Sequence, residues 1–181
     1  MKWLYWSLGL GSVAVAVGVW LPLSGVAGQD RSSEARQHPD LYIEQPRWEL
    51  FDASGKPAQR LQAQRLEQRA GEPDARLVAP RMQLTDARKR HWRVRSERGR
   101  LSADGDSLHL QRRVSLHPAA ASDGPHLNTE RLSIATRENR LETDAPVVLK
   151  SGAWHYRAGG LRIDLDGRRI EMLNRVEGLH D

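Results

Sequence analysis

The sequence predicts an all-β domain, in the form of a sandwich, barrel or roll, that follows one N-terminal transmembrane helix. From Leu41 onward, short runs with an apolar residue at every second position alternate with turn residues, and this period is typical of strands with one buried face. The runs recur at intervals of roughly 8–12 residues, which favours an all-β architecture. The segment 3–26 differs from everything after it, because it contains no charged residue.

Residues 1–28 are expected to form the membrane anchor. A helix needs about 20 apolar residues to cross the hydrocarbon core of a bilayer, and the uncharged segment is long enough. Lys2 precedes this segment, so the positive-inside tendency places a short N-terminus in the cytoplasm and the remaining chain across the membrane. Aromatic residues that suit a membrane interface lie near the two ends of the segment: Trp3, Tyr5, Trp6 and Trp20.

Two features of the anchor leave alternatives open. Small residues share one face of the expected helix and would let it approach other membrane helices closely, although small residues are also simply common in such spans. These residues are Ser7, Gly11, Ala14 and Gly18. The small residues Gly25, Val26 and Ala27 could instead mark the cleavage site of a signal peptide, but the apolar region of a signal peptide usually spans about 7–15 residues.

Residues 29–40 are polar and are expected to be a flexible tether. Residues 41–181 then have the length of one ordinary domain. The chain carries 28 Lys and Arg against 23 Asp and Glu, a formal net charge of +5. A basic surface attracts nucleic acid, anionic lipid headgroups or phosphate-bearing ligands. Beside a membrane anchor the lipid and phosphate ligands are the more plausible, and no nucleic-acid partner is expected.

The expected strands share the two-residue period and end at turn residues. In chain order they are 42–51, 60–66, 77–85, 92–96, 98–101, 108–116, 127–135, 147–149, 154–156, 161–165 and 168–176. Gly55 can supply positive φ in the first turn, Pro80 marks an edge or a bulge, and Asp104-Gly105 indicates a hairpin. Residues 57–70 have helical propensity, but Leu61 and Ala63 alternate and favour a strand.

The residues expected for most catalytic and metal sites are missing or scattered. The chain has no cysteine, which excludes thiol catalysis and thiolate metal sites. No phosphate-binding glycine loop or nucleophile elbow occurs in the polar part, and the histidines do not have metal-ligand spacing. Two close Asp pairs, Asp104 with Asp106 and Asp164 with Asp166, lie at hairpin turns, where Asp has a backbone role. We therefore expect neither an enzyme nor a bound metal or cofactor.

The alternation divides the strand residues into an inward and an outward set. The inward residues form either a filled core or a groove between two sheets that is left open for acyl chains, and the sequence alone does not separate these possibilities. They are Trp48, Leu50, Leu61, Met82, Leu84, Trp92, Val94, Leu108, Leu110, Leu132, Ile134, Trp154, Tyr156, Ile163 and Met172. Many outward residues are arginines, which could form a solvated face or steer a phosphate-bearing amphiphile: Arg93, Arg95, Arg112, Arg113, Arg162, Arg168 and Arg169.

The order of features and several short stretches resemble one known family. The stretches are Asp52-Ala53-Ser54-Gly55, Arg60-Leu61-Gln62-Ala63, Leu84-Thr85, Trp92-Arg93-Val94, Gly99-Arg100-Leu101, Leu108-His109-Leu110, Thr143-Asp144-Ala145-Pro146-Val147 and Gly159-Gly160-Leu161. Together with a non-cleaved anchor and a polar tether, they resemble the lipopolysaccharide export system protein LptC family over nearly the whole chain.

The resemblance implies a fold, a location and partners. The fold would be an open β-jellyroll of two packed antiparallel sheets, in the periplasm and anchored in the inner membrane of a Gram-negative cell. The domain would receive lipopolysaccharide from the inner-membrane ABC transporter subunits and pass it to a periplasmic bridge protein of the same β-jellyroll type. No cofactor is implied.

The resemblance also suggests roles for individual residues. Acyl chains would contact the inward residues other than Trp154 and Met172. Gly55 would correspond to one glycine of the family and Gly152 to a second only with a shift of one residue, and Gly160 would be a further structural glycine. The partner would pair with the last strand, through Arg169, Ile170, Met172, Asn174 and Val176.

Two other readings remain. The first is a membrane-anchored β scaffold that binds only protein partners in envelope assembly. The second is a secreted or anchored carbohydrate-active enzyme with a jellyroll fold, which the lack of a clustered carboxylate pair disfavours.

Overall fold

The computed structural model describes residues 41–180, apart from 52–54, 56 and 121–123. The expected anchor (1–28), its small-residue face and the tether (29–40) lie outside the described residues. Among the described residues, no helix is long and apolar enough to cross a membrane.

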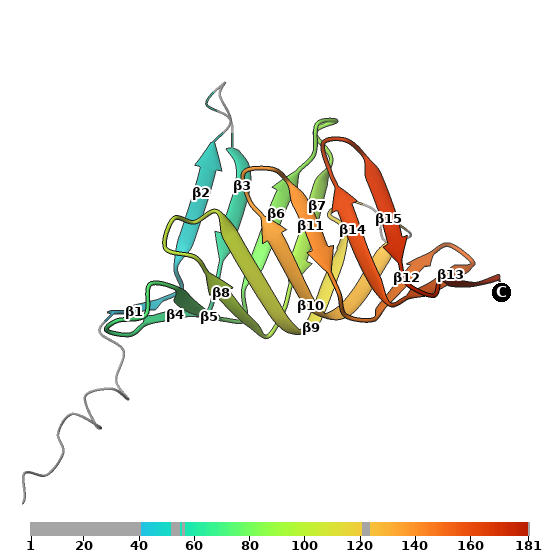
Figure 1. Ribbon diagram of the computed structural model, residues 1–181. Coiled ribbons are helices and arrows are strands. Elements are labelled where there is room, and N and C mark those ends of the chain that lie inside the picture. Colours follow the sequence, from blue (N-terminus) through green and yellow to red (C-terminus); the bar gives the residue numbers. More distant parts are fainter. Residues whose placement is uncertain (1–40, 52–54, 56, 121–123, 181) are drawn as a thin grey trace, which may run out of the picture. The chain divides into compact units, whose positions relative to one another are not determined.

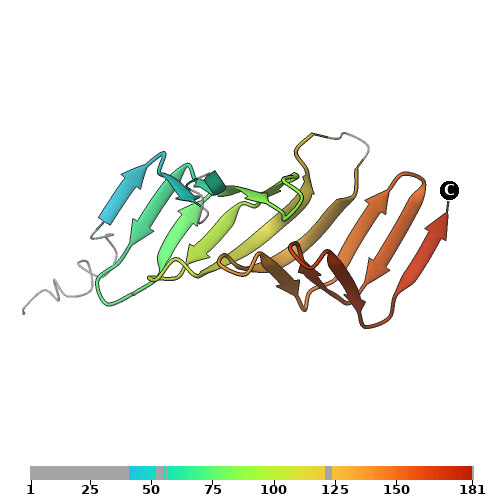
Figure 2. The same cartoon turned by 90° about the horizontal axis from the view of Figure 1, so that it is seen from above.

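The described residues contain antiparallel β-strands and no helix (Figure 1). The strands are β1 (Leu41–Glu44), β2 (Arg47–Phe51), β3 (Pro57–Gln62), β4 (Arg65–Gln68), β5 (Ala75–Val78), β6 (Arg81–Thr85), β7 (His91–Arg95), β8 (Arg98–Leu101), β9 (Ser107–Pro118), β10 (His126–Ala135), β11 (Arg140–Thr143), β12 (Val147–Ser151), β13 (Trp154–Ala158), β14 (Gly160–Asp164), β15 (Arg169–Leu173) and β16 (Glu177–His180). Figure 2 shows that the chain progresses from one end of the domain, where the blue strands lie, to the other end, where the red strand near the C-terminus lies.

The strands build two antiparallel layers that are joined along a line of bends. We call layer A the strands β1, β4, β5, β8, β11, β14 and β15 with residues 107–111 and 131–135. Layer B consists of β2, β3, β6, β7, β12, β13 and β16 with residues 115–118 and 126–129. Consecutive strands such as β1 and β2 form one segment that crosses from one layer to the other. Each segment pairs in both layers with the next segment along the chain, so that β1 pairs with β4 and β2 pairs with β3. The two expected sheets are thus one continuous meander folded on itself.

The bends have a recurring backbone cause. Gln45 and Ala79 both adopt φ of 49°, and each is followed by a proline that cannot donate to the strand ladder. Backbone hydrogen bonds continue across the bends, for example from the Gln45 N–H to the Gln64 carbonyl at 3.0 Å and from the Ala79 N–H to the Glu97 carbonyl at 2.9 Å. Bending therefore changes the direction of the sheet without leaving its backbone groups unpaired.

These bends divide several of the strands expected from the sequence. The run 42–51 is two strands, β1 and β2, and the run 60–66 is divided between β3 and β4. The expected last strand, 168–176, contains β15, but its predicted end was wrong: β15 ends at Leu173, the chain bends at Asn174 and Arg175 with φ of 58° and 40°, and β16 follows. Strand β11 was not expected. A bend of only one or two residues barely interrupts the alternation of apolar and polar residues, so the sequence pattern does not show that the strand is divided there.

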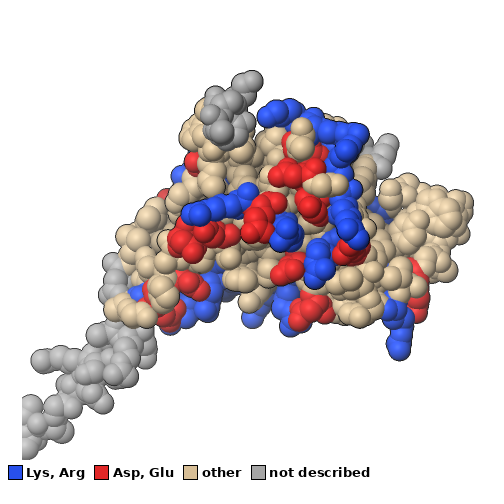
Figure 3. Space-filling view, turned by 45° about the horizontal axis from the view of Figure 1, so that its top comes forward, with Lys and Arg blue, Asp and Glu red and all other residues tan. Residues whose placement is uncertain are grey.

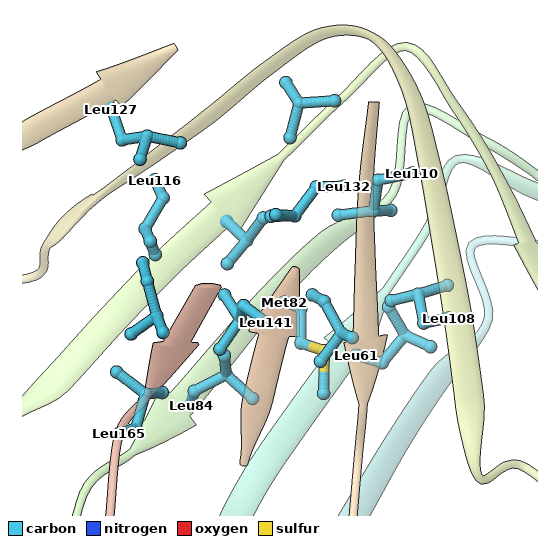
Figure 4. Packing of buried hydrophobic residues seen from close by; sticks show 14 of the residues in the cluster. Leu61, Met82, Leu84, Leu108, Leu110, Leu116, Leu127, Leu132, Leu141 and Leu165 are labelled. Carbon is cyan, nitrogen blue, oxygen red and sulfur yellow. The ribbon is translucent and has the colours of Figure 1, made fainter. Parts of the chain in front are cut away.

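Apolar side chains from both layers fill the space between the layers, whereas charged side chains cover the outer face seen in Figure 3. Leu84 of layer B and Leu108, Leu141 and Leu161 of layer A have no exposed surface. Figure 4 shows Leu61, Met82 and Leu84 from one layer beside Leu108 and Leu141 from the other. The middle of the domain is therefore a packed core.

Candidate functional site

The inward residues divide between the packed core and the two ends of the folded sheet. Most of the groove candidates are buried in the core: Leu61, Met82, Leu84, Val94, Leu108, Leu110, Leu132, Ile134 and Ile163. The others are partly exposed, with Trp48 and Leu50 near the β1/β2 end and Trp92 and Tyr156 toward the β15/β16 end. The filled-core reading of the sequence describes the middle, and open apolar surface remains at the ends.

An apolar cavity of about 210 Å³ lies between the layers toward the β15/β16 end. Layer B contributes the side chains Trp92, Leu116, Leu127 and Leu149 to its wall. The wall on the layer A side consists of Ile163, Leu165 and Ile170. Ile163 and Ile170 are direct cross-strand partners on β14 and β15, so they present one continuous apolar surface.

The floor of the cavity continues as a cross-strand row toward the edge of layer B. The register aligns Leu116 with Leu127, Leu127 with Leu149 and Leu149 with Tyr156. Leu116 and Leu127 are buried, while Leu149 and Tyr156 are half-buried. The apolar row therefore becomes accessible from the core outward, in the direction in which Figure 1 shows β13 diverging from β14 and β15.

Aromatic and aliphatic side chains line this open end. The Trp154 ring stacks on Tyr156 with 5.9 Å between centroids and meets His180 edge-on at 4.5 Å. Trp154 is nonetheless 46% exposed, and Ile170 on the other layer is 52% exposed. Both layers therefore present a large apolar side chain to solvent toward this end of the domain, and such exposed apolar surface is available for binding.

The two last strands of the layers both have a free edge here. Among the described residues, β15 pairs only with β14, and β16 pairs only with β13. Of the residues expected to pair with a partner, Arg169, Ile170 and Met172 lie on β15, while Asn174 and Val176 lie in the bend between β15 and β16. A free edge offers unpaired backbone groups to a strand of another protein.

Charged residues occupy the rim of the cavity. Asp86 is buried, and its carboxylate accepts the Arg90 Nε at 2.8 Å, the Trp92 indole N–H at 3.3 Å and the backbone N–H groups of Arg88 and Arg90 at 2.9 Å. Burial raises the pKa of Asp86, but these donors outweigh it and hold the pKa below its ordinary value. The ionised carboxylate thus fixes Arg90 and Trp92 beside the cavity.

Arg168 completes the rim from the turn between β14 and β15. Its side chain is exposed and has no hydrogen bond or ion pair to another described residue. Asp164, also at the rim, accepts the Gly167 backbone N–H at 2.7 Å, which shapes that turn. The rim therefore carries one anchored guanidinium and one free guanidinium beside an apolar cavity.

The opposite end of the domain also has apolar inner-face residues and free edges. Leu41 and Ile43 on β1 are 44% and 39% exposed, and Leu50 on β2 is 39% exposed. Within the described part of the chain, β1 pairs only with β4, and β2 only with β3. Both ends of the folded sheet are thus open to a strand and to an apolar group.

The three glycines singled out in the sequence occupy different environments. Gly55 and Gly152 have φ of 77° and 58° in hairpin turns, a conformation that suits glycine. Gly160 lies at the bend into β14, where a Cβ atom would be 2.9 Å from the Thr143 carbonyl oxygen. The requirement at Gly160 is therefore close backbone approach.

The described carboxylates do not form a metal-binding cluster. Within the described part of the chain, no group of three or more His, Asp or Glu side chains could hold a metal ion. Asp104 accepts the Ser102 hydroxyl at 2.6 Å and the Asp106 N–H at 2.9 Å, and these hydrogen bonds lower its pKa. Asp166 accepts the Asn139 amide at 3.1 Å. These Asp residues organise turns.

Sequence reasoning missed several cavity residues. Leu116, Leu127, Leu149 and Leu165 were not among the groove candidates, although the two-residue period already directs Leu116 and Leu149 inward. Whether an inward side chain lies in the cavity or in the packed core depends on which side chains the opposite layer places against it. The two-residue period of a strand contains no information about the opposite layer.

Comparison with known proteins identifies the family. The model of the family described as "Lipopolysaccharide-assembly, LptC-related" matches residues 11–181. No protein in the curated set matches the chain significantly. The folded all-β domain and its open apolar ends are consistent with this match, which covers most of the chain. The chain therefore belongs to the LptC-related family, whose members take part in lipopolysaccharide transport in the cell envelope.

Proposed function

We propose that the protein is an anchored periplasmic carrier that receives lipopolysaccharide from the inner-membrane ABC transporter and passes it to a periplasmic bridge protein. The observation that supports this most directly is the apolar cavity that opens at the β15/β16 end under a rim with Arg90 and Arg168. Such a site offers hydrocarbon contacts to acyl chains and guanidinium groups to phosphates.

The energetics of acyl chains require such a site. Each methylene group taken out of water is worth about 0.8 kcal/mol, so several acyl chains cannot cross an aqueous compartment uncovered. The cavity of about 210 Å³ lies below the roughly 300–1,000 Å³ of ordinary small-molecule pockets. Loading therefore requires the β14/β15 pair and the β12/β13/β16 strands to separate further at their open end.

The free edges supply the routes between proteins. A partner strand that pairs with β15 or β16 would extend a layer through main-chain hydrogen bonds and prolong the apolar floor. In this proposal the β1/β2 end faces the transporter side and the β15/β16 end faces the bridge protein. Residues 1–28 anchor the protein in the inner membrane with the N-terminus in the cytoplasm, and their small-residue face contacts the transporter's helices.

Photo-crosslinking from neighbouring residues of β12 tests lipid carriage. A photoreactive amino acid at Leu149, which lines the cavity, should give a lipopolysaccharide adduct in cells. The matched control is Val148, the adjacent residue, whose side chain lies on the outer face. Position 92 should also be labelled, whereas position 110 in the packed core should not. Equal labelling at 148 and 149, or no lipid adduct at 149 or 92 in a folded protein, would exclude carriage in this cavity.

A protein-binding scaffold is the second candidate, because the middle of the domain is packed and both ends have free edges. The same experiment separates it from the carrier. A scaffold would give protein adducts from β15 and β16 with no lipid adduct from positions 92 and 149. The carrier gives both.

A further inference from the structure

The outer faces of the two layers differ in how their charges are paired. On layer B, cations follow one another across the strands with few carboxylates between them. We call these residues the basic face: Arg47, Arg81, Arg93, Arg95, Lys150 and Arg157. All are exposed, and none forms an ion pair with a described residue.

The strand register places the basic face in rows. Arg81 is opposite Arg95 on β6 and β7, and Arg93 is opposite His117 on β7 and β9. His117 stacks on His126 with 5.4 Å between ring centroids. His126 is opposite Lys150 on β12. The row from Arg93 through His117 and His126 to Lys150 therefore carries positive or protonatable side chains across four adjacent strands. Like charges placed opposite one another destabilise a sheet unless something neutralises them.

Layer A shows the contrasting arrangement. Arg162 lies between Glu142 and Glu171 at 3.8 Å and 3.6 Å, Arg131 bonds Asp144 at 3.2 Å, and Arg76 bonds Glu72 at 2.8 Å. The two outer faces belong to one meander and experience the same solvent. The shortage of carboxylates on layer B is thus specific to that face, where the acidic residues of the strands are Glu49, already paired with Arg60 at 2.8 Å, and Glu177 at the edge, opposite Arg157.

The side chains between the cations indicate the class of partner. Protein interfaces usually have a core of aromatic and aliphatic residues inside a polar rim. Between the cations of the basic face the register places the polar residues Gln62, Gln83, Ser115 and Asn128 and one half-buried apolar residue, Val148. Such a face provides many similar attractions and no cluster of apolar anchors at its centre, as a surface of lipid phosphates requires.

The first part of the chain brings a bilayer within reach. Residues 3–26 contain no charged residue, and residues 29–40 separate them from β1. At about 3.3–3.6 Å per residue, that linker spans at most about 40 Å when extended. We propose that the basic face of layer B lies on the headgroups of an anionic phospholipid bilayer. This contact does not require the cavity to carry lipid.

A pair of single-cysteine variants tests which face meets the bilayer. The natural chain has no cysteine, so Asn128→Cys and Ser133→Cys each provide one site for a fluorophore. Both lie on β10, with residue 128 on the outer face of layer B and residue 133 on that of layer A. The full-length protein is mixed with vesicles whose headgroups carry a nitroxide quencher, made of phosphatidylcholine alone or with phosphatidylglycerol.

We expect strong quenching at position 128 with phosphatidylglycerol, weak quenching there without it, and weak quenching at position 133 in both. The double variant Arg81→Glu/Arg93→Glu should weaken the phosphatidylglycerol-dependent contact by at least about tenfold. The matched control Arg98→Glu/Arg100→Glu makes the same charge change on β8 of layer A and should leave it unchanged. Raising the salt to about 1 M, where the screening length is about 3 Å, should abolish it.

Other outcomes overturn the inference. Equal quenching at positions 128 and 133, or quenching that does not depend on phosphatidylglycerol, excludes the basic face as the contact. A photoreactive group at position 128 that captures a protein in cells, with no vesicle quenching, assigns the face to an acidic protein instead. Lipopolysaccharide crosslinking from position 149 should persist in Arg81→Glu/Arg93→Glu, so a failure of carriage and a failure of this contact are distinguishable.

Discussion

The Asp86 side chain organises both the backbone and the neighbouring side chains at the β6–β7 turn. Asp86 collects two backbone N–H groups, the Trp92 indole and the Arg90 guanidinium, and so links the β6–β7 turn to the cavity rim. A carboxylate with this many donors is stabilised in its charged form.

Asp86→Asn should therefore destabilise the domain in a pH-dependent way. The folded-state pKa of Asp86 is lowered, so its contribution is complete above the unfolded pKa of about 3.9 and is lost as the pH falls through the folded-state value. We expect the variant to lose about 1–3 kcal/mol at pH 7 and to approach the natural protein at lower pH. Thermal unfolding at several pH values measures this, and a cost independent of pH would contradict it.

Gly160→Ala should destabilise the bend between β13 and β14. The added methyl group meets the Thr143 carbonyl oxygen at 2.9 Å and the Leu173 Cβ at 3.5 Å, and neither belongs to the end of a flexible side chain. Overpacking of this kind costs about 1–3 kcal/mol. Gly152→Asn is the control, because position 152 has open space and asparagine tolerates its positive φ. Similar unfolding midpoints for the two variants would argue against the close approach as the cause.

At the scale of single elements, β15 is both a wall of the cavity and a free edge. Residues 170 and 172 direct their N–H groups to one side of the strand and residue 171 to the other. Proline at 170 or 172 and proline at 171 therefore remove hydrogen bonds on opposite sides. One substitution should break the ladder to β14 and lower stability, while the other should keep the fold and abolish pairing with a bridge protein.

Co-purification of the bridge protein and thermal unfolding of each proline variant test this together. Leu179→Pro in β16 is the matched control for the other free edge. If every folded variant in β15 retains the partner while Leu179→Pro loses it, the partner pairs with β16. If the folded proline variants of both β15 and β16 keep the partner, strand addition at this end is excluded.

At the scale of the whole molecule, the sequence predicted well which side of the sheet a residue faces, but it predicted poorly how deeply that residue is buried. Alternation directed Trp48, Leu84, Leu110 and Tyr156 inward, and the register places all four on the inner faces. Whether such a residue is core or open surface depends on the layer across from it. Leu110 is 1% exposed because both layers meet there, whereas Tyr156 lies where they diverge.

The bends in the strands could not be predicted from the sequence for a related reason. Gln45 and Ala79 adopt positive φ without being glycine, and their only local signal is the following proline. The sequence reading gave Pro80 an edge or bulge role, which is close to its position at a bend, but it did not indicate that the sheet folds there. Folding at every bend, in register, is a property of the assembled meander.

The folded meander must open at one end to load a lipid, and closing that end should block loading. Leu149→Cys and Ile170→Cys place thiols on opposite walls of the cavity in a chain without natural cysteines. Joining them with a short cleavable bis-maleimide should abolish lipopolysaccharide crosslinking from position 92, because the layers can no longer separate, and cleaving the linker should restore it. Each single cysteine treated with the same reagent is the control. Full lipid labelling in the joined protein would mean that the lipid does not enter between these layers.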